Sequence, residues 1–470
     1  MIVKNFEDIN ISNFPVVIFG SGPAGISTAI ELEKKNIKTL IIEAGNSEYS
    51  DKSQEFYKGK IVGDQISDLS ESRLRQFGGT SGHWGGWVKP MEKFNIDSWD
   101  FNSNDLISYQ NKACEILDVK NKFRKAKISD YFNQIEIQTS PVRFSNKYYE
   151  HINKSNKIFL LLNTQLSHFE GKENTSKYAV CFNQNNTFNI KAKYFVLSCG
   201  CIENSRILLW SRVKNPSLID KRLPIGKFWM NHPYILGASG GISRLNLKKL
   251  LGNNFITYEG NLHLATANTL IKEKNILSAH IFMKFEEDLK LHKEIVRDIL
   301  CVAPEYGNKI MNMVLKKDLQ CGNIYLSLEE PSQSENQISL DDKMDLNNIP
   351  RVKLFYKKSL KSIETAKIAL EELANFVRLK DLGRIGLKKN IYNMEGFDSM
   401  GAYHHLGGTR IGSNFNTSVV DKDLKVHRVN NLYVNGSSNF ASGGYSNPTF
   451  TIVEFALRLA NHLAKKLNKS

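Results

Sequence analysis

Three observations predict an α/β fold with two domains for this 470-residue chain. The first is a glycine-rich turn between an apolar strand and a helix near the N-terminus, which is the pattern of a parallel βαβ unit. The second is a middle region in which strand patterns alternate with charged helices. The third is a return to glycine-rich loops, followed by an amphipathic C-terminal helix. A chain of this length also exceeds what one small core accommodates.

The N-terminal turn predicts a Rossmann-like nucleotide-binding domain. It comprises Gly20, Ser21, Gly22, Pro23, Ala24 and Gly25 and follows the apolar strand at residues 16–19. The first glycine permits the tight turn, the second lets the backbone approach a pyrophosphate, and the third lets helix and strand pack closely. A pyrophosphate would lie on the helix N-terminus, where free N–H groups and the helix dipole favour negative charge.

An acidic residue completes this fingerprint. Glu43 follows a second apolar strand at residues 38–42, eighteen residues after Gly25. Its carboxylate is placed to accept hydrogen bonds from an adenosine ribose. An acid at this position argues against a 2′-phosphate and favours FAD or NAD, and the fingerprint alone does not separate these two.

The second domain is predicted to be an α+β domain built on an antiparallel sheet. Strand patterns occur at residues 322–328 and 351–356. Residues 451–467 show apolar side chains at helical spacing and predict a long closing helix. We expect the domains to interleave, with 1–95, 155–234 and 393–470 in the nucleotide-binding domain and 96–154 and 235–392 in the other.

Composition narrows the possible partners and compartments. The net charge is +15, but the 63 lysines and arginines are spread along the chain, so we expect no nucleic-acid partner. A field of this sign can enrich anionic substrates, anionic polymers or an acidic protein partner near the active site, and an anionic small-molecule substrate is one of these alternatives. The chain shows no transmembrane segment and no secretory signal, which predicts a cytoplasmic protein, with export alongside a partner left open. Six scattered cysteines suggest reduced thiols, and no metal motif is present.

Two loops near the C-terminus carry a family resemblance. They span residues 403–412, which include His404, His405 and Thr409, and residues 436–451, which include Asn447. With the N-terminal fingerprint, they resemble the glucose–methanol–choline (GMC) oxidoreductases. The stretches 78–87, 197–206, 225–233 and 419–434 match the same family in the same order. The region around 329–356 is similar to one bacterial branch, near the pyranose oxidases and sugar dehydrogenases.

The resemblance implies FAD and two catalytic residues. His405, four residues before Thr409, corresponds to the family's catalytic histidine, and Asn447 corresponds to the second catalytic position. A histidine that titrates near neutrality can take the hydroxyl proton as hydride leaves carbon for flavin N5. An asparagine amide can hold the substrate oxygen. For the adjacent His404 we expect a structural role, because neighbouring side chains usually point apart.

The cofactor site is predicted from the fingerprint and from the resemblance. It comprises Gly20, Gly22, Pro23, Ala24, Gly25, Glu43, Gly78, Gly79, Ser81, His83, Gly436, Asn447, Pro448 and Thr449. Gly436 stands where many members have aspartate, which weakens one specific contact. His83 aligns with the histidine that tethers flavin in pyranose oxidases. Two interpretations therefore stay open: His83 forms a covalent bond to FAD, or its side chain only packs beside the flavin ring.

The predicted activity is oxidation of a sugar, cyclitol or glycoside-type hydroxyl by an FAD-dependent dehydrogenase or oxidase. Two alternatives remain: a non-redox or light-driven enzyme, such as a lyase or decarboxylase, and a flavin electron-carrier subunit of a larger complex. The sequence leaves open whether oxygen, a quinone or a partner protein accepts the electrons.

Overall fold

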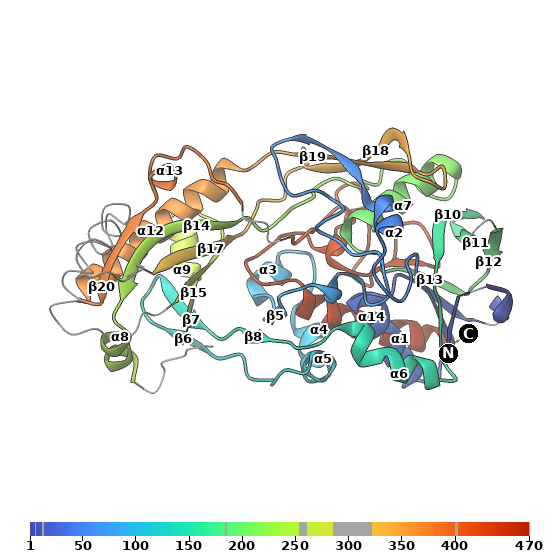
Figure 1. The fold of residues 1–470 in the computed structure, drawn as a ribbon, viewed down its shortest axis with the longest axis horizontal. Helices are drawn as coiled ribbons and strands as arrows, with labels where there is room; N and C mark the ends of the chain where they lie inside the picture. Colours follow the sequence, from blue (N-terminus) through green and yellow to red (C-terminus); the bar gives the residue numbers. More distant parts are fainter. Residues whose placement is uncertain are drawn as a thin grey trace.

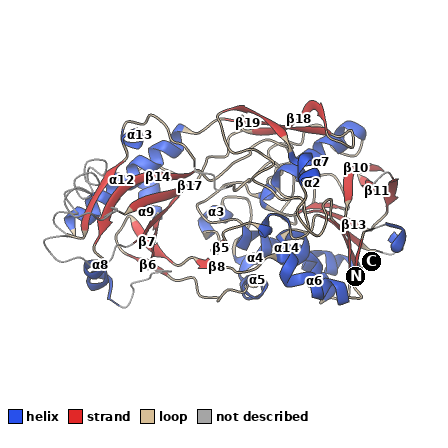
Figure 2. Ribbon diagram, in the orientation of Figure 1, coloured by secondary structure: helices blue, strands red, loops and turns tan. Residues whose placement is uncertain are grey.

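The structure of this chain is a computed structural model that describes residues 1–4, 6–11, 14–183, 186–252, 261–284, 322–399 and 403–469. Figure 1 shows an elongated molecule with two lobes. One lobe contains both chain termini and the elements labelled α1, α14 and β13, and the other contains α12, β14 and β17. Helices lie against a sheet in each lobe (Figure 2).

A six-stranded sheet forms the centre of the first lobe. Its strand order is β1 (Ile2–Val3), β9 (Ile158–Leu161), β3 (Thr39–Ile42), β2 (Val16–Phe19), β13 (Tyr194–Leu197) and β21 (Leu432–Val434). All its pairings are parallel. Strands β2 and β3 are buried along their whole length, as expected for a parallel sheet covered on both faces. The predicted βαβ unit is therefore present, with α1 (Pro23–Glu33) after the glycine turn.

The predicted C-terminal helix packs against that unit. Helix α14 (Thr449–Asn468) contacts α1 and buries Phe455, Leu459 and Leu463, which recur at helical spacing. Helix α7 (Cys201–Lys214) begins directly after Gly200. The pairing of α1 with α14 brings the two ends of the chain to the same nucleotide-binding lobe.

A seven-stranded antiparallel sheet forms the centre of the second lobe. Its order is β20 (Gly383–Leu387), β14 (Tyr234–Ile242), β17 (Asn323–Leu328), β16 (Ala279–Lys284), β15 (Asn261–Thr266), β7 (Phe132–Ile135) and β6 (Lys125–Lys127). Helix α12 (Leu360–Leu379) covers it through buried Ala366, Leu370 and Leu373. The predicted fold class, an α/β nucleotide-binding part with an antiparallel α+β part, is confirmed.

Smaller elements connect the lobes. Strands β18 (Gln337–Met344), β19 (Pro350–Tyr356) and β4 (Gly59–Gly63) form one small sheet, and β10 (Thr164–Lys172), β11 (Thr175–Asn183) and β12 (Asn186–Ile190) form another. Strands β5 (Trp87–Val88) and β8 (Gln138–Thr139) pair. The remaining helices are α2 (Asp51–Gln54), α3 (Lys93–Asp97), α4 (Asn104–Ile107), α5 (Gln110–Leu117), α6 (Phe144–Lys154), α8 (Arg244–Leu251), α9 (Asn268–Glu273) and α13 (Lys389–Tyr392).

The two main hydrophobic cores follow the two large sheets. Residues of α3 to α6, such as Ile96, Leu106 and Phe144, belong to the core of the parallel sheet. The same core includes Val352 and Leu354 of β19. These residues lie in sequence ranges that we assigned to the second domain, and the exact domain boundaries stay a prediction.

The described residues contain no candidate membrane span or metal cluster, and four of the cysteines lie among them. Among them, no helix is long and apolar enough to cross a membrane. The described part of the chain contains no cluster of metal-ligating side chains. Cys114, Cys181, Cys199 and Cys201 are free thiols in the structure, while Cys301 and Cys321 lie outside the described residues.

Candidate active site

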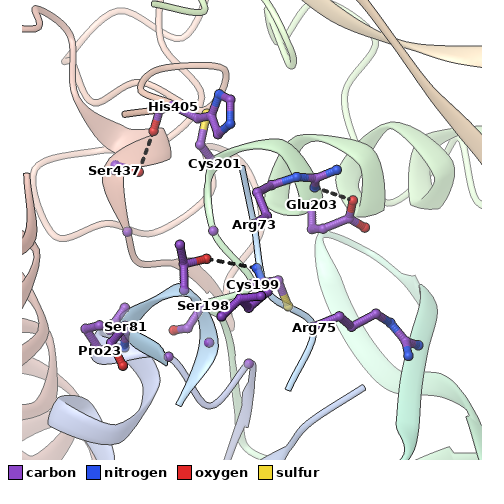
Figure 3. A pocket seen from close by; sticks show the side chains of 18 of the residues that line it. Pro23, Arg73, Arg75, Ser81, Ser198, Cys199, Cys201, Glu203, His405 and Ser437 are labelled. Carbon is purple, nitrogen blue, oxygen red and sulfur yellow. Dashed lines mark hydrogen bonds and ion pairs between the residues drawn. The ribbon is translucent and has the colours of Figure 1, made fainter. Parts of the chain in front are cut away.

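A cavity of about 650 Å³ is lined by residues of both lobes. We call one part the nucleotide end, defined by Gly20, Gly22, Pro23, Glu43 and residues 164–167. We call the other the histidine end, defined by His404, His405, Asn447, Tyr234, His280 and Ser327. In Figure 3, Pro23 and Ser81 lie far from His405 and Ser437 across this cavity. Every predicted cofactor residue except Gly25 and Gly78 lines it.

The glycines of the nucleotide end have different surroundings. A Cβ added to Gly25 would lie 1.9 Å from the carbonyl oxygen of Gly20, so this glycine permits helix α1 to pack on the turn. A Cβ added to Gly22 would meet nothing within 4 Å. Gly22 therefore leaves open space on the cavity side. This is the arrangement that the fingerprint predicts, although Gly25 acts from behind the cavity wall.

Glu43 holds the turn together from the end of β3. Its Oε2 accepts hydrogen bonds from the N–H (3.0 Å) and the hydroxyl (2.7 Å) of Ser21. Its Oε1 accepts a bond from the N–H of Gly45 at 2.8 Å. The carboxylate is buried but lines the cavity, and each of its oxygens can accept more than one bond. Glu43 therefore shapes the glycine turn and keeps acceptor capacity for a ribose.

The nucleotide end fits a dinucleotide such as FAD. No side chain caps the N-terminus of α1, which leaves its first N–H groups for a phosphate. A Cβ on Gly200 would also meet nothing within 4 Å, so a second stretch of backbone faces open space. Ser198 lines the cavity, and its buried hydroxyl has no partner among the described residues. Such a hydroxyl is suited to a ligand hydrogen bond.

The loop at residues 78–87 forms one wall of the cavity. Gly78 has φ +85°, and a Cβ there would lie 2.6 Å from the backbone nitrogen of Ser145, so this glycine faces α6. Ser81 Oγ donates to the Gly78 carbonyl at 2.7 Å and accepts from the N–H of Phe144 at 3.1 Å. These bonds fix the loop beneath His83, which is exposed and lines the cavity. Partial burial and then Arg143 lower the pKa of His83, which favours its neutral form.

His404 is central to the hydrogen bonds at the histidine end. Asn447 Nδ2 donates to Nε2 of His404 at 3.3 Å. Nδ1 of His404 lies 3.0 Å from Nδ1 of His232, and the two rings are nearly perpendicular. His232 Nε2 in turn donates to the carbonyl oxygen of Gly443 at 3.1 Å. A continuous chain of hydrogen bonds therefore links a buried backbone carbonyl to Asn447 in the cavity.

His405 has different partners. Its Nε2 lies 2.8 Å from the hydroxyl of Ser72, and its ring packs against Trp229 with centroids 5.7 Å apart. Its Nδ1 is buried without a hydrogen-bond partner among the described residues. Burial, followed by the charge of Arg73, lowers the pKa of His405 to about 3. His405 is thus a buried neutral ring in the cavity wall.

A second layer supports the histidines. The N–H of His404 donates to Oδ1 of Asn231 at 3.2 Å, and the N–H of Asn231 donates to Glu330 at 2.9 Å. The Tyr356 hydroxyl donates to the other Glu330 oxygen at 2.6 Å. Burial raises the pKa of Glu330 to about 7. The turn before Pro233 is therefore fixed by a buried carboxyl group rather than by packing alone.

The antiparallel sheet supplies the opposite wall. In its register Tyr234 of β14 pairs with Ser327 of β17, and Ser327 pairs with His280 of β16. All three residues line the cavity, so they form a polar row across three neighbouring strands. Trp84 and Trp87 line the same cavity. This combination of aromatic surface and a few polar groups is typical of a small-molecule site.

The predicted catalytic residues both line the cavity, but no hydrogen bond links them to each other in the described structure. Asn447 bonds His404, for which we expected only a structural role, while His405 bonds Ser72. The assignment of His405 stays a prediction. The sequence analysis gave no role to His232, Tyr234, His280 or Ser327. His232 lies in the stretch 225–233, which matched the family in the sequence, whereas the other three belong to no local motif.

Comparisons with known proteins agree on one family. Residues 332–456 match the family model described as GMC oxidoreductase. A 2-methyl-1,2-propanediol dehydrogenase of Mycolicibacterium austroafricanum is 23% identical over 59% of this chain and 49% of that protein. A pyranose 2-oxidase of Tricholoma matsutake is 41% identical over 15% of this chain and 12% of that protein. The matches thus span about half or less of these relatives.

The fold comparison covers nearly the whole chain. A solved structure of pyridoxine 4-oxidase from Mesorbium loti covers 96% of this chain and 99% of its own, with a TM-score of 0.64 and 13% identity. A structure of a fungal aryl-alcohol oxidase has the same TM-score, with 10% identity over 98% of this chain and 100% of its own. Because the sequence identities are only 13% and 10%, these structural similarities are evidence about the fold alone.

Proposed function

This chain belongs to the glucose–methanol–choline family of FAD-binding oxidoreductases, and we propose that it oxidises a hydroxyl group of a sugar, cyclitol or glycoside-type alcohol. The nucleotide end would hold FAD through the N-terminus of α1, the open backbone at Gly22 and the carboxylate of Glu43. FAD, when bound, supplies the acceptor for a hydride.

The polar row of Tyr234, Ser327 and His280 carries the substrate proposal. A polyol presents several hydroxyl groups at once, and three hydrogen-bonding side chains on adjacent strands can engage more than one of them. Trp84 and Trp87 add aromatic surface against which a sugar ring can pack. An anionic substrate, expected from the net charge, stays a prediction.

The side chains of the protein have little chemistry of their own to perform. Oxidation of the alcohol removes a hydride from carbon, which bound FAD would accept, and a proton from the hydroxyl, and the product is a carbonyl compound. A neutral histidine at the histidine end accepts the proton, and the amide of Asn447 holds the oxygen in line with it. Both histidines there, His404 and His405, are kept neutral by burial, which lowers their pKa values.

Turnover with a panel of substrates tests the proposal. The purified flavin-containing protein would be assayed with sugars, glycosides, cyclitols and sugar acids, using a quinone or a redox dye as electron acceptor. We expect substrate-dependent reduction of the acceptor with at least one polyol and formation of a carbonyl product. Retention of flavin without any alcohol oxidation would instead favour an electron-carrier subunit or a non-redox enzyme.

A further inference from the structure

We propose that the polar row of Tyr234, Ser327 and His280 holds a carboxylate group of the substrate, and that His280 is the residue that determines this specificity. This inference rests on the proposed alcohol oxidation and narrows its substrate to an alcohol that also carries an acid group, such as a uronic or aldonic acid. It is drawn from the unpaired polar groups of the row, from the pairing of His280 with His263 and from the charges behind the cavity wall.

The side chains of the row have polar groups without partners. No hydrogen bond joins the hydroxyls of Tyr234 and Ser327, or Nδ1 of His280, to another residue in the described part of the chain. His280 is only 2% exposed and Ser327 only 9%. Buried polar groups in folded proteins nearly always have a hydrogen-bond partner. A row of unpaired groups that lines a cavity therefore indicates a ligand.

The other nitrogen of His280 meets a second buried histidine. Nε2 of His280 lies 3.0 Å from Nδ1 of His263, and the two rings are nearly parallel. Burial lowers the pKa of His263 to about 4. Burial, then His263 and Lys89, lowers the pKa of His280 well below its usual value. Both rings are therefore neutral, and each carries one N–H.

The proton between the two rings belongs to His263. Nε2 of His263 is buried without a partner among the described residues. A proton on that nitrogen would be a buried donor left unpaired, which is rarer in folded proteins than an unpaired acceptor. The single proton of His263 is therefore on Nδ1, from which it donates to Nε2 of His280. The single proton of His280 is then on its Nδ1.

The row therefore presents hydrogen-bond donors to the cavity. Nδ1–H of His280 can only donate, and the hydroxyls of Tyr234 and Ser327 can donate as well. In the sheet, the long side chains of Tyr234 and His280 stand on either side of the short Ser327, which leaves room over the serine for a ligand group. A carboxylate suits this place, because its two oxygens only accept hydrogen bonds and have about four lone-pair sites.

The charges behind the row favour an anion. Lys89 is buried, and its charge acts on His280. The ammonium groups of Lys89 and Lys125 lie 2.9 Å and 3.0 Å from the two oxygens of one carboxylate, that of Glu92. This trio therefore has one positive charge in excess. In a poorly hydrated cavity wall, such a charge attracts an anion more strongly than it would in water.

The carboxylates of the cavity lie elsewhere. Among the described lining residues they are Glu43, which bonds the glycine turn, and Glu203, which pairs with Arg73 at 2.9 Å. Glu329 follows β17 but does not line the cavity, and burial raises its pKa, which favours its neutral form. An acid group at the row therefore meets donors and an excess positive charge, without a competing carboxylate from the described lining residues.

Matched pairs of substrates give the first test. Turnover of the flavin-containing protein with a redox dye would be compared for sugars and their C6 acids, such as glucose with glucuronate and galactose with galacturonate. The uncharged glucuronamide controls for size. We expect kcat/KM to be about 10- to 100-fold higher for the acids, the worth of one hydrogen bond to a charged group. Equal or better use of the neutral members overturns this inference and leaves the proposed function standing.

Three substitutions locate the carboxylate at the row. His280→Leu removes the ring N–H, and Ser327→Ala removes one hydroxyl. Lys125→Gln removes the excess charge, and Lys127→Gln, on the same strand and paired with Asp130, is its matched control.

The expected losses differ in size. We expect His280→Leu to abolish the preference for the acid and Ser327→Ala to reduce it. Lys125→Gln should reduce it by about two- to fivefold, and Lys127→Gln should leave it unchanged. A preference that His280→Leu leaves intact overturns the inference. If His280→Leu does not fold, an undiminished preference in both Ser327→Ala and Lys125→Gln overturns it.

Binding of a carboxylate that has no hydroxyl tests the site without turnover. Cyclohexanecarboxylate and its uncharged amide would be titrated into the flavin-containing protein and followed by calorimetry. We expect the carboxylate to bind at least about 10-fold more tightly, and this advantage to be lost in His280→Leu. Equal binding of the two compounds overturns the inference, whether or not the enzyme oxidises an alcohol. A flavin that no alcohol reduces, in a protein that still prefers the carboxylate, overturns the proposed function instead.

Discussion

The nucleotide end and the histidine end of the cavity are built in different ways. At the nucleotide end, Gly20, Gly22, Gly25 and Glu43 come from one βαβ unit, and local geometry makes their roles clear. At the histidine end, the histidine pair and Asn447 come from distant parts of the chain, and so do the partners of the two histidines, Ser72 and His232. The first end is specified by a short motif, and the second only by how separate loops pack together. Variants at each end should therefore fail differently.

The largest effect is expected from Gly25→Ala. The added methyl would lie 1.9 Å from the Gly20 carbonyl, so the turn and α1 cannot keep their packing. We expect almost complete loss of retained flavin and a lower Tm of the flavin-free protein. The measurements are the flavin absorbance of the purified protein and its thermal unfolding after flavin removal.

Gly22→Ala is the matched control for that prediction. Gly22 has φ −75°, which alanine adopts, and its added methyl meets only open space. We expect weaker flavin retention with an almost unchanged Tm of the flavin-free protein. Equal destabilisation by the two substitutions would show that the cavity side and the packing side of this turn are not distinct.

The next effect concerns the attachment of the cofactor at His83. If this exposed cavity residue bonds the flavin, His83→Ala converts a covalent cofactor into one that acid precipitation releases. A neutral imidazole is a competent nucleophile toward an electron-poor ring. If the bond is present, the acid pellet of the wild-type protein stays coloured and the mass of the wild-type protein is increased by that of the flavin. Release of all flavin from the wild-type protein would contradict the covalent bond, and His83 would then only pack beside the flavin ring.

A smaller effect is expected from Glu43→Ala. The substitution leaves three buried donors on Ser21 and Gly45 without their acceptor. Hydrogen bonds to charged groups are worth about 1.5–3 kcal/mol each, so FAD affinity and apoprotein stability should both fall. FAD binding would be measured by fluorescence, with Glu43→Gln as the variant that retains one oxygen. Unchanged FAD affinity in Glu43→Ala would contradict a role for this residue at the ribose.

The smallest effect is a pH dependence of stability from Glu454 in α14. Burial raises the pKa of this carboxyl to about 8 from an ordinary 4.5. Because the folded pKa is the higher one, its stabilising contribution is complete below about pH 4.5 and is lost as pH rises through 8. Relative to Glu454→Gln, wild-type Tm should therefore fall between about pH 5 and pH 9. Parallel Tm profiles would rule out this titration.

The sequence alone predicts the structure correctly where that structure depends on residues close together in the chain. The strand, glycine turn, helix and Glu43 follow one another along the chain, so spacing alone predicted their arrangement. The polar row required the register of three strands, Tyr234 with Ser327 and Ser327 with His280, which no local pattern specifies. The partners of the two adjacent histidines, His232 for His404 and Ser72 for His405, likewise depend on how separate loops pack. Side-chain direction in an irregular loop cannot be derived from spacing.

The most direct measurement is the absorbance spectrum of the bound flavin during anaerobic addition of polyols. If the histidine end removes a hydroxyl proton while hydride passes to the cofactor held at the nucleotide end, an active sugar or cyclitol will bleach the oxidised flavin bands in a single turnover. The account predicts this bleaching for at least one polyol. Flavin that remains fully oxidised with every polyol, although dithionite reduces it, would contradict the account.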